Sequence, residues 1–313
     1  MRFFVGVTDW DWWSLHAAQE SVDEVNFWRP SPTAGFAALQ PGELFLFKLH
    51  SPRNFISGGG FFSKFVSLPV SLAWEAFGLA NGARSQTEVR ARISQYRKTP
   101  IAFGEDPNIG CILLEEPFFW PEEDWIDSTS YFSLNIVSGK TFATGTELGD
   151  SLWLLVQERL VRVREREADP GPSLLSVTQP DRYGTPQLVF PRLGQGSFRV
   201  LVTDAYQRRC AMTGEKTLPV LQAAHIRPYA REGPHEIPNG ILLRSDLHTL
   251  FDRGYLGIDP KDRRIVVSPR IREQYENGKH YYALHGQPVA LPTDATLIPS
   301  YENLLFHIEN VFQ

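Results

Sequence analysis

Four residues that can carry out acid–base or metal chemistry fall within one loop-rich stretch of the chain. In the segment AAHIRPYAREGPHEIPNGILLRSDLHTLFDRG they are His225, Asn239, His248 and Asp252. A hydrophobic core does not require this mixture of imidazole, amide and carboxylate groups. The mixture is suited to binding a divalent cation and to moving a proton at neutral pH.

The end of this stretch, SDLHTLFDRG, has the features of a short helix. Ser245 suits the N-cap, Asp246 the first turn and Gly254 the position just after the helix. His248 and Asp252 are then i and i+4, so their side chains leave one face of the helix about 6 Å apart. This spacing is used to hold a divalent ion, although His–Asp pairs of this kind also occur on ordinary surfaces.

The other two residues each have two interpretations. His225 ends an apolar run where a strand gives way to a loop. It is either a base that accepts a proton from water or a half-buried structural histidine. Asn239, in the segment IPNG, is either a residue that braces the loop or an ordinary turn residue.

The spacing of the four residues resembles the HNH nuclease superfamily, which has the ββα-metal fold. The segments CAMTGE, AAHIRPY and PNGILLRSDLHTLFDRGYLGI are similar to the bacterial HNH branch found in restriction endonucleases, and the resemblance spans roughly residues 191–259. It implies that His225 is the general base and that Asn239 braces the loop and orients His225 by hydrogen bonding. It also implies that His248 and Asp252 hold the catalytic cation from the helix.

The same resemblance implies a cofactor and a substrate. The cation would be Mg²⁺ or Mn²⁺, with Ni²⁺ or Zn²⁺ as alternatives, and it would stabilise the charge at the scissile phosphate. Arg227 and Arg244 are candidates for binding DNA phosphates, or are ordinary surface arginines. Two features depart from the family. Ala224 stands where many members have another metal ligand, and Cys210 has no partner for a zinc knuckle, which predicts a buried small residue.

The N-terminal part of the chain is rich in aromatic residues. The segments FFVGVTD, VNFWRPS, LQPGELFLFKLHSP and ISGGGFF resemble the PUA-like group that includes EVE and YTH domains. That resemblance implies a small β-barrel with helices and an aromatic pocket for a flipped, modified base. The candidate pocket residues are Trp12, Asn26 and Trp28, followed by Asp9 and Arg53. The alternative is that these aromatic side chains form a core.

Length and composition are consistent with a two-domain α+β protein. We expect residues 1–150 to form the PUA/EVE-like domain, residues 151–186 a helix and linker, and residues 187–313 the HNH domain. The net charge of -5 does not indicate nucleic-acid binding, but residues 191–230 hold six Arg or Lys against two acidic residues. The absence of a long apolar run and of a signal-peptide pattern predicts a cytoplasmic protein.

The sequence therefore predicts a modification-dependent DNA endonuclease of the restriction type. Its partner would be double-stranded DNA with modified bases, not a membrane, and cutting both strands suggests a homodimer. One alternative is an HNH nuclease that recognises DNA structure or damage. The other is a DNA-binding protein with an inactive HNH fold, which Ala224 favours and the intact His225, His248 and Asp252 oppose.

Overall fold

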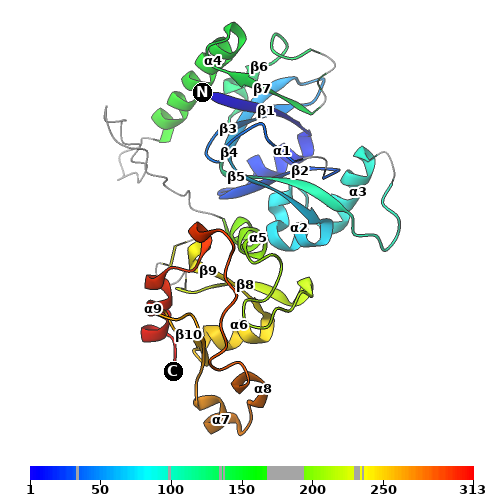
Figure 1. The fold of residues 1–313 in the computed structure, drawn as a ribbon. Helices are drawn as coiled ribbons and strands as arrows, with labels where there is room; N and C mark the ends of the chain where they lie inside the picture. The colour runs from blue at the N-terminus through cyan, green and yellow to red at the C-terminus, as the bar shows by residue number, and fades with distance from the viewer. Residues whose placement is uncertain are drawn as a thin grey trace, which may run out of the picture. The chain divides into compact units, whose positions relative to one another are not determined.

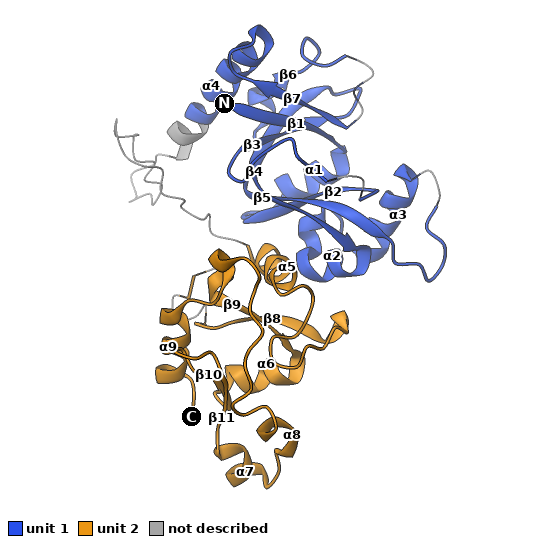
Figure 2. Cartoon of the chain, in the orientation of Figure 1, with its two compact units in different colours: residues 1–191 blue, residues 192–313 orange. Residues whose placement is uncertain are grey.

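The chain contains two compact units, Met1–Pro191 and Arg192–Gln313 (Figure 2). The structure is a computed structural model that describes residues 1–32, 35–97, 100–133, 136, 138–167, 194–228, 233–234 and 236–313. Both units combine helices with sheets, which confirms the predicted α+β class. Most of the predicted linker, from residue 168 to 186, lies outside the described residues.

Unit 1 is built on a seven-stranded sheet with the order β2-β5-β4-β3-β1-β7, and β6 pairs with β4 (Figure 1). Its strands are β1 (Arg2–Thr8), β2 (Glu24–Arg29), β3 (Leu44–Leu49), β4 (Phe55–Pro69), β5 (Asn108–Phe119), β6 (Ile126–Asp127) and β7 (Gly139–Ala143). The pairing of β1 with β3 is parallel, and the other pairs are antiparallel.

The predicted small barrel is an open sheet. Within the described residues, β2 and β7 end the order and do not pair with each other. The long strand β4 changes register against β5 on both sides of Phe61. At Gly58, φ is +156°, and an added Cβ would lie 2.3 Å from the carbonyl oxygen of Phe118, so only glycine fits.

The core of unit 1 lies on both faces of this sheet. Successive side chains of a strand point to opposite faces, so the run LFLF in β3 feeds two clusters. Phe45 and Phe47 belong to one cluster, and Leu44 and Leu46 to the other. All four side chains are almost completely buried, as expected for a strand that is covered on both faces.

Helices cover the sheet of unit 1: α1 (Trp10–Ala17), α2 (Val70–Phe77), α3 (Gln86–Tyr96) and α4 (Glu147–Glu167), with short 3-10 turns η1 (Gly78–Asn81) and η2 (Glu122–Asp124). The sequence placed residues 151–186 in a separate helix and linker. The structure instead packs α4 onto unit 1, because Leu152 and Val156 are fully buried in the cluster that contains Leu44 and Leu46.

Unit 2 contains the ββα arrangement that the sequence predicts. The hairpin of β8 (Leu221–His225) and β9 (Gly240–Arg244) leads directly into α6 (Ser245–Asp252). Around it are α5 (Gln195–Ala205), η3 (Leu218–Val220), η5 (Ile237–Asn239), β10 (Leu256–Ile258), β11 (Ile265–Val267), α7 (Arg270–Tyr275), α8 (Lys279–Tyr282), η6 (Ala295–Leu297) and α9 (Tyr301–Asn310). Because α6 begins at Ser245, its N-cap is Arg244, one residue earlier than predicted.

Two glycines allow close packing around this hairpin. An added Cβ at Gly240 would lie 2.3 Å from Cγ2 of Val202, so glycine lets α5 approach the start of β9. Gly254 has φ of +75° after α6, as the predicted helix stop requires, and an added Cβ there would lie 2.0 Å from the carbonyl oxygen of Val311. Glycine therefore lets the hairpin pack closely on α5 and lets the end of α6 pack closely on the segment at Val311.

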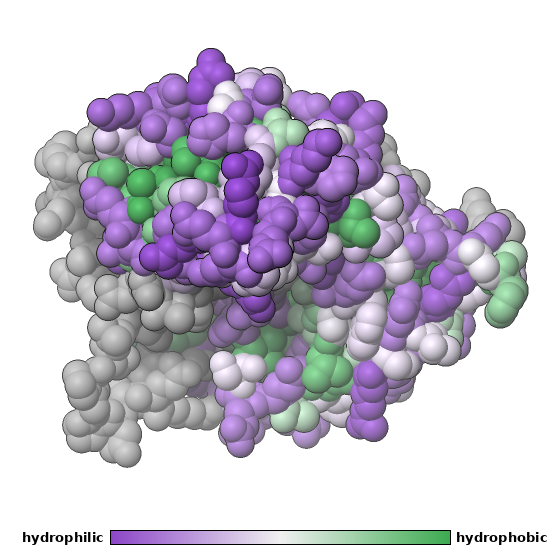
Figure 3. Space-filling model, turned by 90° about the horizontal axis from the view of Figure 1, so that it is seen from below, coloured by the Kyte–Doolittle hydropathy of each residue, from purple (hydrophilic) through white to green (hydrophobic). Residues whose placement is uncertain are grey.

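On the face shown in Figure 3, hydrophilic side chains predominate and hydrophobic ones form small, separate groups. Across the described residues, no helix combines the length and the apolar character needed to cross a bilayer.

Candidate active site

The side chain of His225 is held at the end of β8 by an aromatic ring. Its backbone pairs with Gly240 of β9, which fixes where the strand ends. Its imidazole stacks on Phe198 of α5, with ring centroids 3.9 Å apart and an interplanar angle of 6°. Phe198 is 2% exposed, so the ring that supports His225 is part of the core of unit 2. The imidazole is half-buried and has a defined orientation.

Asn239 braces the loop that follows β8. Its side chain is fully buried. Its Oδ1 accepts a hydrogen bond from the Arg227 amide at 2.8 Å, and its Nδ2 donates to the carbonyls of Arg227 at 3.0 Å and Pro234 at 2.9 Å. These bonds fix the backbone two residues beyond His225.

His248 and Asp252 lie on one face of α6, as the i,i+4 spacing predicts. Nε2 of His248 is 3.2 Å from Oδ2 of Asp252, and Nδ1 of His248 is 2.8 Å from Oε1 of Gln222 on β8. The two ring nitrogens therefore face different partners. The His248 side chain is 22% exposed and that of Asp252 is 55% exposed, so both are accessible from solvent.

These two side chains fit a divalent cation in part. An imidazole nitrogen and a carboxylate oxygen converge at 3.2 Å, a donor pair suited to Mg²⁺ or Mn²⁺ as well as to Ni²⁺ or Zn²⁺. No cluster of three or more His, Cys, Asp or Glu side chains suitable for a metal is found among the described residues. Ala224, where a further ligand was missing from the sequence, is fully buried. The described donor set is therefore a pair, and a cation held by it would keep several waters.

A cavity of about 450 Å³ brings the two histidines together. It is lined by Gln195, Phe198, Arg199, Gln222, Ala223, His225 and His248. The walls come from α5, β8 and α6, so the hairpin and both helices contribute to one site. The sequence singled out His225 and His248. It did not single out Arg199, whose guanidinium group α5 adds to the same cavity.

The two predicted phosphate-binding arginines have other partners. The guanidinium of Arg227 lies over the ring of Phe306, 4.7 Å from its centroid. Arg244 makes a two-point ion pair with Asp246, at 2.6 and 2.8 Å. The hydrogen bond from Arg244 lowers the pKa of Asp246, so the carboxylate compensates the charge of this arginine. Neither arginine lines the cavity, whereas Arg199 does.

Two of the three predicted base-pocket residues are buried inside unit 1. Trp12 is 3% exposed and packs edge-on against Phe27 and Phe47, and Gly82 lies directly against its indole ring. Asn26 is fully buried and donates a hydrogen bond to Asn81 at 2.9 Å. The prediction that Trp12 and Asn26 face a base is therefore wrong for this conformation. Helix α1 turns Trp12 into the core, which is the alternative that the sequence left open.

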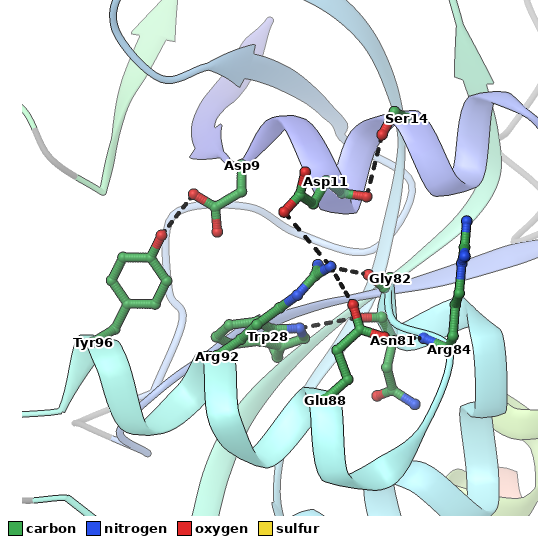
Figure 4. Close-up of polar contacts among 10 residues, drawn as sticks. All are labelled: Asp9, Asp11, Ser14, Trp28, Asn81, Gly82, Arg84, Glu88, Arg92 and Tyr96. Carbon is green, nitrogen blue, oxygen red and sulfur yellow. Dashed lines mark hydrogen bonds and ion pairs between the residues drawn. The ribbon is translucent and has the colours of Figure 1, made fainter.

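Trp28 and its neighbours lie nearer the surface. Its indole nitrogen donates to the carbonyl of Asn81 at 3.0 Å, and its ring centroid is 6.4 Å from that of Tyr96 (Figure 4). The hydroxyl of Tyr96 points toward Asp9 and donates to it at 2.7 Å (Figure 4). Burial, and then this hydrogen bond, raise the pKa of Tyr96 to about 12, so its hydroxyl keeps its proton at neutral pH.

An exposed aromatic group adjoins Asp9. Trp10 is 40% exposed, and the guanidinium of Arg53 lies over its ring, 3.9 Å from the centroid. Nε2 of His50 is 3.6 Å from Oδ1 of Asp9. We call Asp9, Trp10, His50, Arg53 and Tyr96 the Asp9 cluster. Asp9 and Arg53 were minor candidates in the sequence, and Trp10 was not singled out.

Comparisons with known proteins agree with the site in unit 2. Residues 210–259 match the HNH endonuclease family, so this part of the chain is an HNH endonuclease domain, as its motifs predicted. The match includes β8, β9 and α6 and therefore all four residues of the candidate site. No curated protein sequence matches the chain.

Two solved structures are similar to larger parts of the chain. One is ASCH, a PUA-like protein, from Zymomonas mobilis, which is 12% identical over 49% of this chain and 94% of its own, with a TM-score of 0.33. The other is the modification-dependent TagI restriction endonuclease, which is 11% identical over 94% of this chain and 77% of its own, with a TM-score of 0.29.

Proposed function

We propose that this protein is a cytoplasmic DNA endonuclease of the restriction type that hydrolyses phosphodiester bonds with the help of a divalent cation. The observation that carries the proposal is the convergence of His225 and His248 on one cavity within an HNH endonuclease domain. A base and a cation ligand that line one cavity suit metal-assisted hydrolysis of a phosphodiester.

Each residue of the chain has a distinct task in this proposal. His225 accepts the proton of the attacking water, because a histidine is largely neutral near pH 7 and can act as a base. Asn239 holds the loop beyond β8, and Phe198 holds the imidazole. Arg199 binds the phosphate, since its side chain lines the cavity and the guanidinium matches phosphate geometry. Arg227 and Arg244 would bind phosphates further from the cavity.

His248 and Asp252 hold the cation, and Mg²⁺ or Mn²⁺ is the first choice because waters would complete its coordination. When bound, such an ion stabilises the negative charge that develops on the phosphate and on the leaving oxygen. Cutting both strands with one site in each chain would require two copies, and we therefore propose a homodimer on DNA.

Unit 1 would direct the nuclease to modified bases. Trp10 is partly exposed, with the guanidinium of Arg53 over its ring and Trp13 stacked on it at 5.2 Å, so a base would stack on this ring in place of Arg53. Stacking on an aromatic ring contributes about 1–3 kcal/mol per base. Asp9 offers a carboxylate that can accept a hydrogen bond from a base amino group. The Asp9 cluster and Trp28 thus replace Trp12 and Asn26 as the proposed reading surface.

A DNA-binding protein without cleavage activity is the second candidate, and Ala224 favours it because a buried methyl group cannot bind a metal. The test is a cleavage assay with the full chain on matched duplexes that differ only in cytosine or adenine modification, with Mg²⁺, Mn²⁺ or EDTA. We expect cleavage with a cation, faster on one modified duplex than on its plain counterpart. Binding without any cleavage would support the second candidate, and equal cleavage of all duplexes would refute modification dependence.

A further inference from the structure

We infer that Gln222 is a positioning residue for His248: its side-chain oxygen accepts the Nδ1 hydrogen of the imidazole and so presents Nε2 to the cation. The motif residues do not include Gln222. The inference rests on the proposed function, because it concerns the same cation site.

The two contacts of His248 lie on opposite sides of its ring. Oε1 of Gln222 is 2.8 Å from Nδ1, and Oδ2 of Asp252 is 3.2 Å from Nε2. A neutral imidazole has one nitrogen that donates and one that accepts. Because an amide oxygen can only accept, the hydrogen belongs on Nδ1, and Nε2 keeps a lone pair that faces Asp252. This is the tautomer that a metal ligand requires.

Gln222 supports the ligand and does not serve as one. A cation held between Nε2 of His248 and the carboxylate of Asp252 lies on the side of the ring away from Gln222. The support matters more here than in a site with three protein ligands, because Ala224 contributes none. With a pair of ligands, any loss of orientation in one of them weakens the whole site.

The strand β8 links this support to the base. Gln222 pairs with Leu243 of β9, and His225 pairs with Gly240, so one hairpin register sets both residues. Both residues line the same cavity. The strand therefore supplies the base directly and orients a cation ligand on α6 through Gln222.

The opposite orientation of the amide gives a different result. If the amide nitrogen donated to Nδ1, the hydrogen would move to Nε2 and point at Asp252. His248 and Asp252 would then form an ordinary surface hydrogen bond. Glutamate distinguishes the two cases, because a carboxylate accepts hydrogen bonds and cannot donate them.

The experiment is calorimetric titration of the full chain with Mn²⁺, with thermal unfolding to verify that each variant is folded. Gln222→Leu should weaken binding about tenfold, the lower end for loss of an outer partner, because this hydrogen bond is exposed. Gln222→Glu should bind within about threefold of the wild type or more tightly. Gln195→Leu is the matched control and should bind Mn²⁺ like the wild type, because Gln195 lines the cavity while the partners of His248 are Gln222 and Asp252.

A His248→Ala variant tests the cation site independently of the positioning role of Gln222. If His248→Ala loses Mn²⁺ binding while Gln222→Leu binds as tightly as the wild type, the cation site stands and the role of Gln222 is refuted. Weak binding by Gln222→Glu, equal to that of Gln222→Leu, refutes it as well. If His248→Ala binds Mn²⁺ like the wild type, the cation site is elsewhere, and the inference on Gln222 fails with it.

Discussion

His225 depends on two residues that keep its imidazole in place. Asn239 fixes the main chain beyond it, and Phe198 supports the ring by stacking at 3.9 Å. A catalytic base must be held close to its productive orientation, because a misplacement of about 1 Å can cost up to about 10²-fold in rate. Phe198 is therefore predicted to act on the turnover number and not only on stability.

We predict that Phe198→Leu lowers kcat by up to about 10²-fold with little change in KM, since most of the apolar volume stays but the flat ring that stacks on the imidazole is lost. Steady-state cleavage kinetics would measure kcat and KM separately. Phe251→Leu is the matched control, because Phe251 stacks on His307 at 3.8 Å and does not line the cavity. A normal kcat for Phe198→Leu, or an equal loss in both variants, would contradict a specific role for the stack.

The residues of the motif could be found from the sequence, but those that support them could not. A His–Asp pair at i,i+4 is common on helix surfaces, but its combined spacing with Asn239 and His225 is specific. Phe198 and Gln222 carry no such signal. A phenylalanine at helical spacing looks like an ordinary core residue, and its contact with His225 depends on how α5 packs on the hairpin.

At the scale of elements, a buried amide holds the described part of the loop between β8 and β9. The side chain of Asn239 makes three hydrogen bonds to the main chain of this loop. A buried polar group left without a partner costs about 1–3 kcal/mol. The loop is therefore predicted to lose its conformation when this amide is removed.

We predict that Asn239→Ala lowers the free energy of unfolding of unit 2 by about 1–3 kcal/mol and also slows cleavage. Urea unfolding and the cleavage assay would measure the two effects together. Asn277→Ala, at an exposed turn, is the control and should change neither. Unaltered cleavage by a destabilised Asn239→Ala protein would show that the amide stabilises the fold without positioning His225.

Helix α1 shows where sequence patterns fail at this scale. The sequence predicts that Trp12 lies in a base pocket, but the segment DWDWW begins a helix. Helical geometry turns Trp12 and His16 inward and leaves Trp10 partly exposed. Three tryptophans among polar residues do not reveal which of them faces the core, because that depends on the packing of α1 against β2 and β3.

At the scale of the whole molecule, buried titratable groups link stability to pH. Burial raises the pKa of Glu115, on β5, from 4.5 to about 7. In the folded state this carboxyl keeps its proton to a higher pH than in the unfolded chain. Its contribution to stability is therefore present below pH 4.5 and is lost as the pH rises through about 7.

We predict that Glu115→Gln stabilises the protein at pH 8 and has little effect at pH 4.5, because an amide cannot ionise. Thermal unfolding of both proteins across this range would show the difference. Glu122→Gln, at an exposed position on the same unit, is the control. A constant difference between wild type and Glu115→Gln at all pH values would show that Glu115 does not titrate in this range.

The boundary of unit 1 illustrates a second limit of prediction from the sequence. The sequence predicted a helix within residues 151–186, and the structure has it as α4 (Glu147–Glu167). The sequence placed that helix outside the first domain, although Leu152 and Val156 are buried against its sheet. Amphipathic spacing shows that a helix has a buried face, but it does not show which domain covers that face.

The central claim is that His225 is the base of a DNA endonuclease, and single-turnover cleavage by His225→Ala tests it most directly. DNA duplexes would be incubated with Mn²⁺ and either the wild type, His225→Ala, or the control His280→Ala, which changes an exposed histidine on α8. We predict that His225→Ala cleaves about 10²–10⁴-fold more slowly, while DNA affinity, Mn²⁺ affinity and the unfolding temperature stay close to those of the wild type. Cleavage by His225→Ala within a few-fold of the wild-type rate would contradict the account.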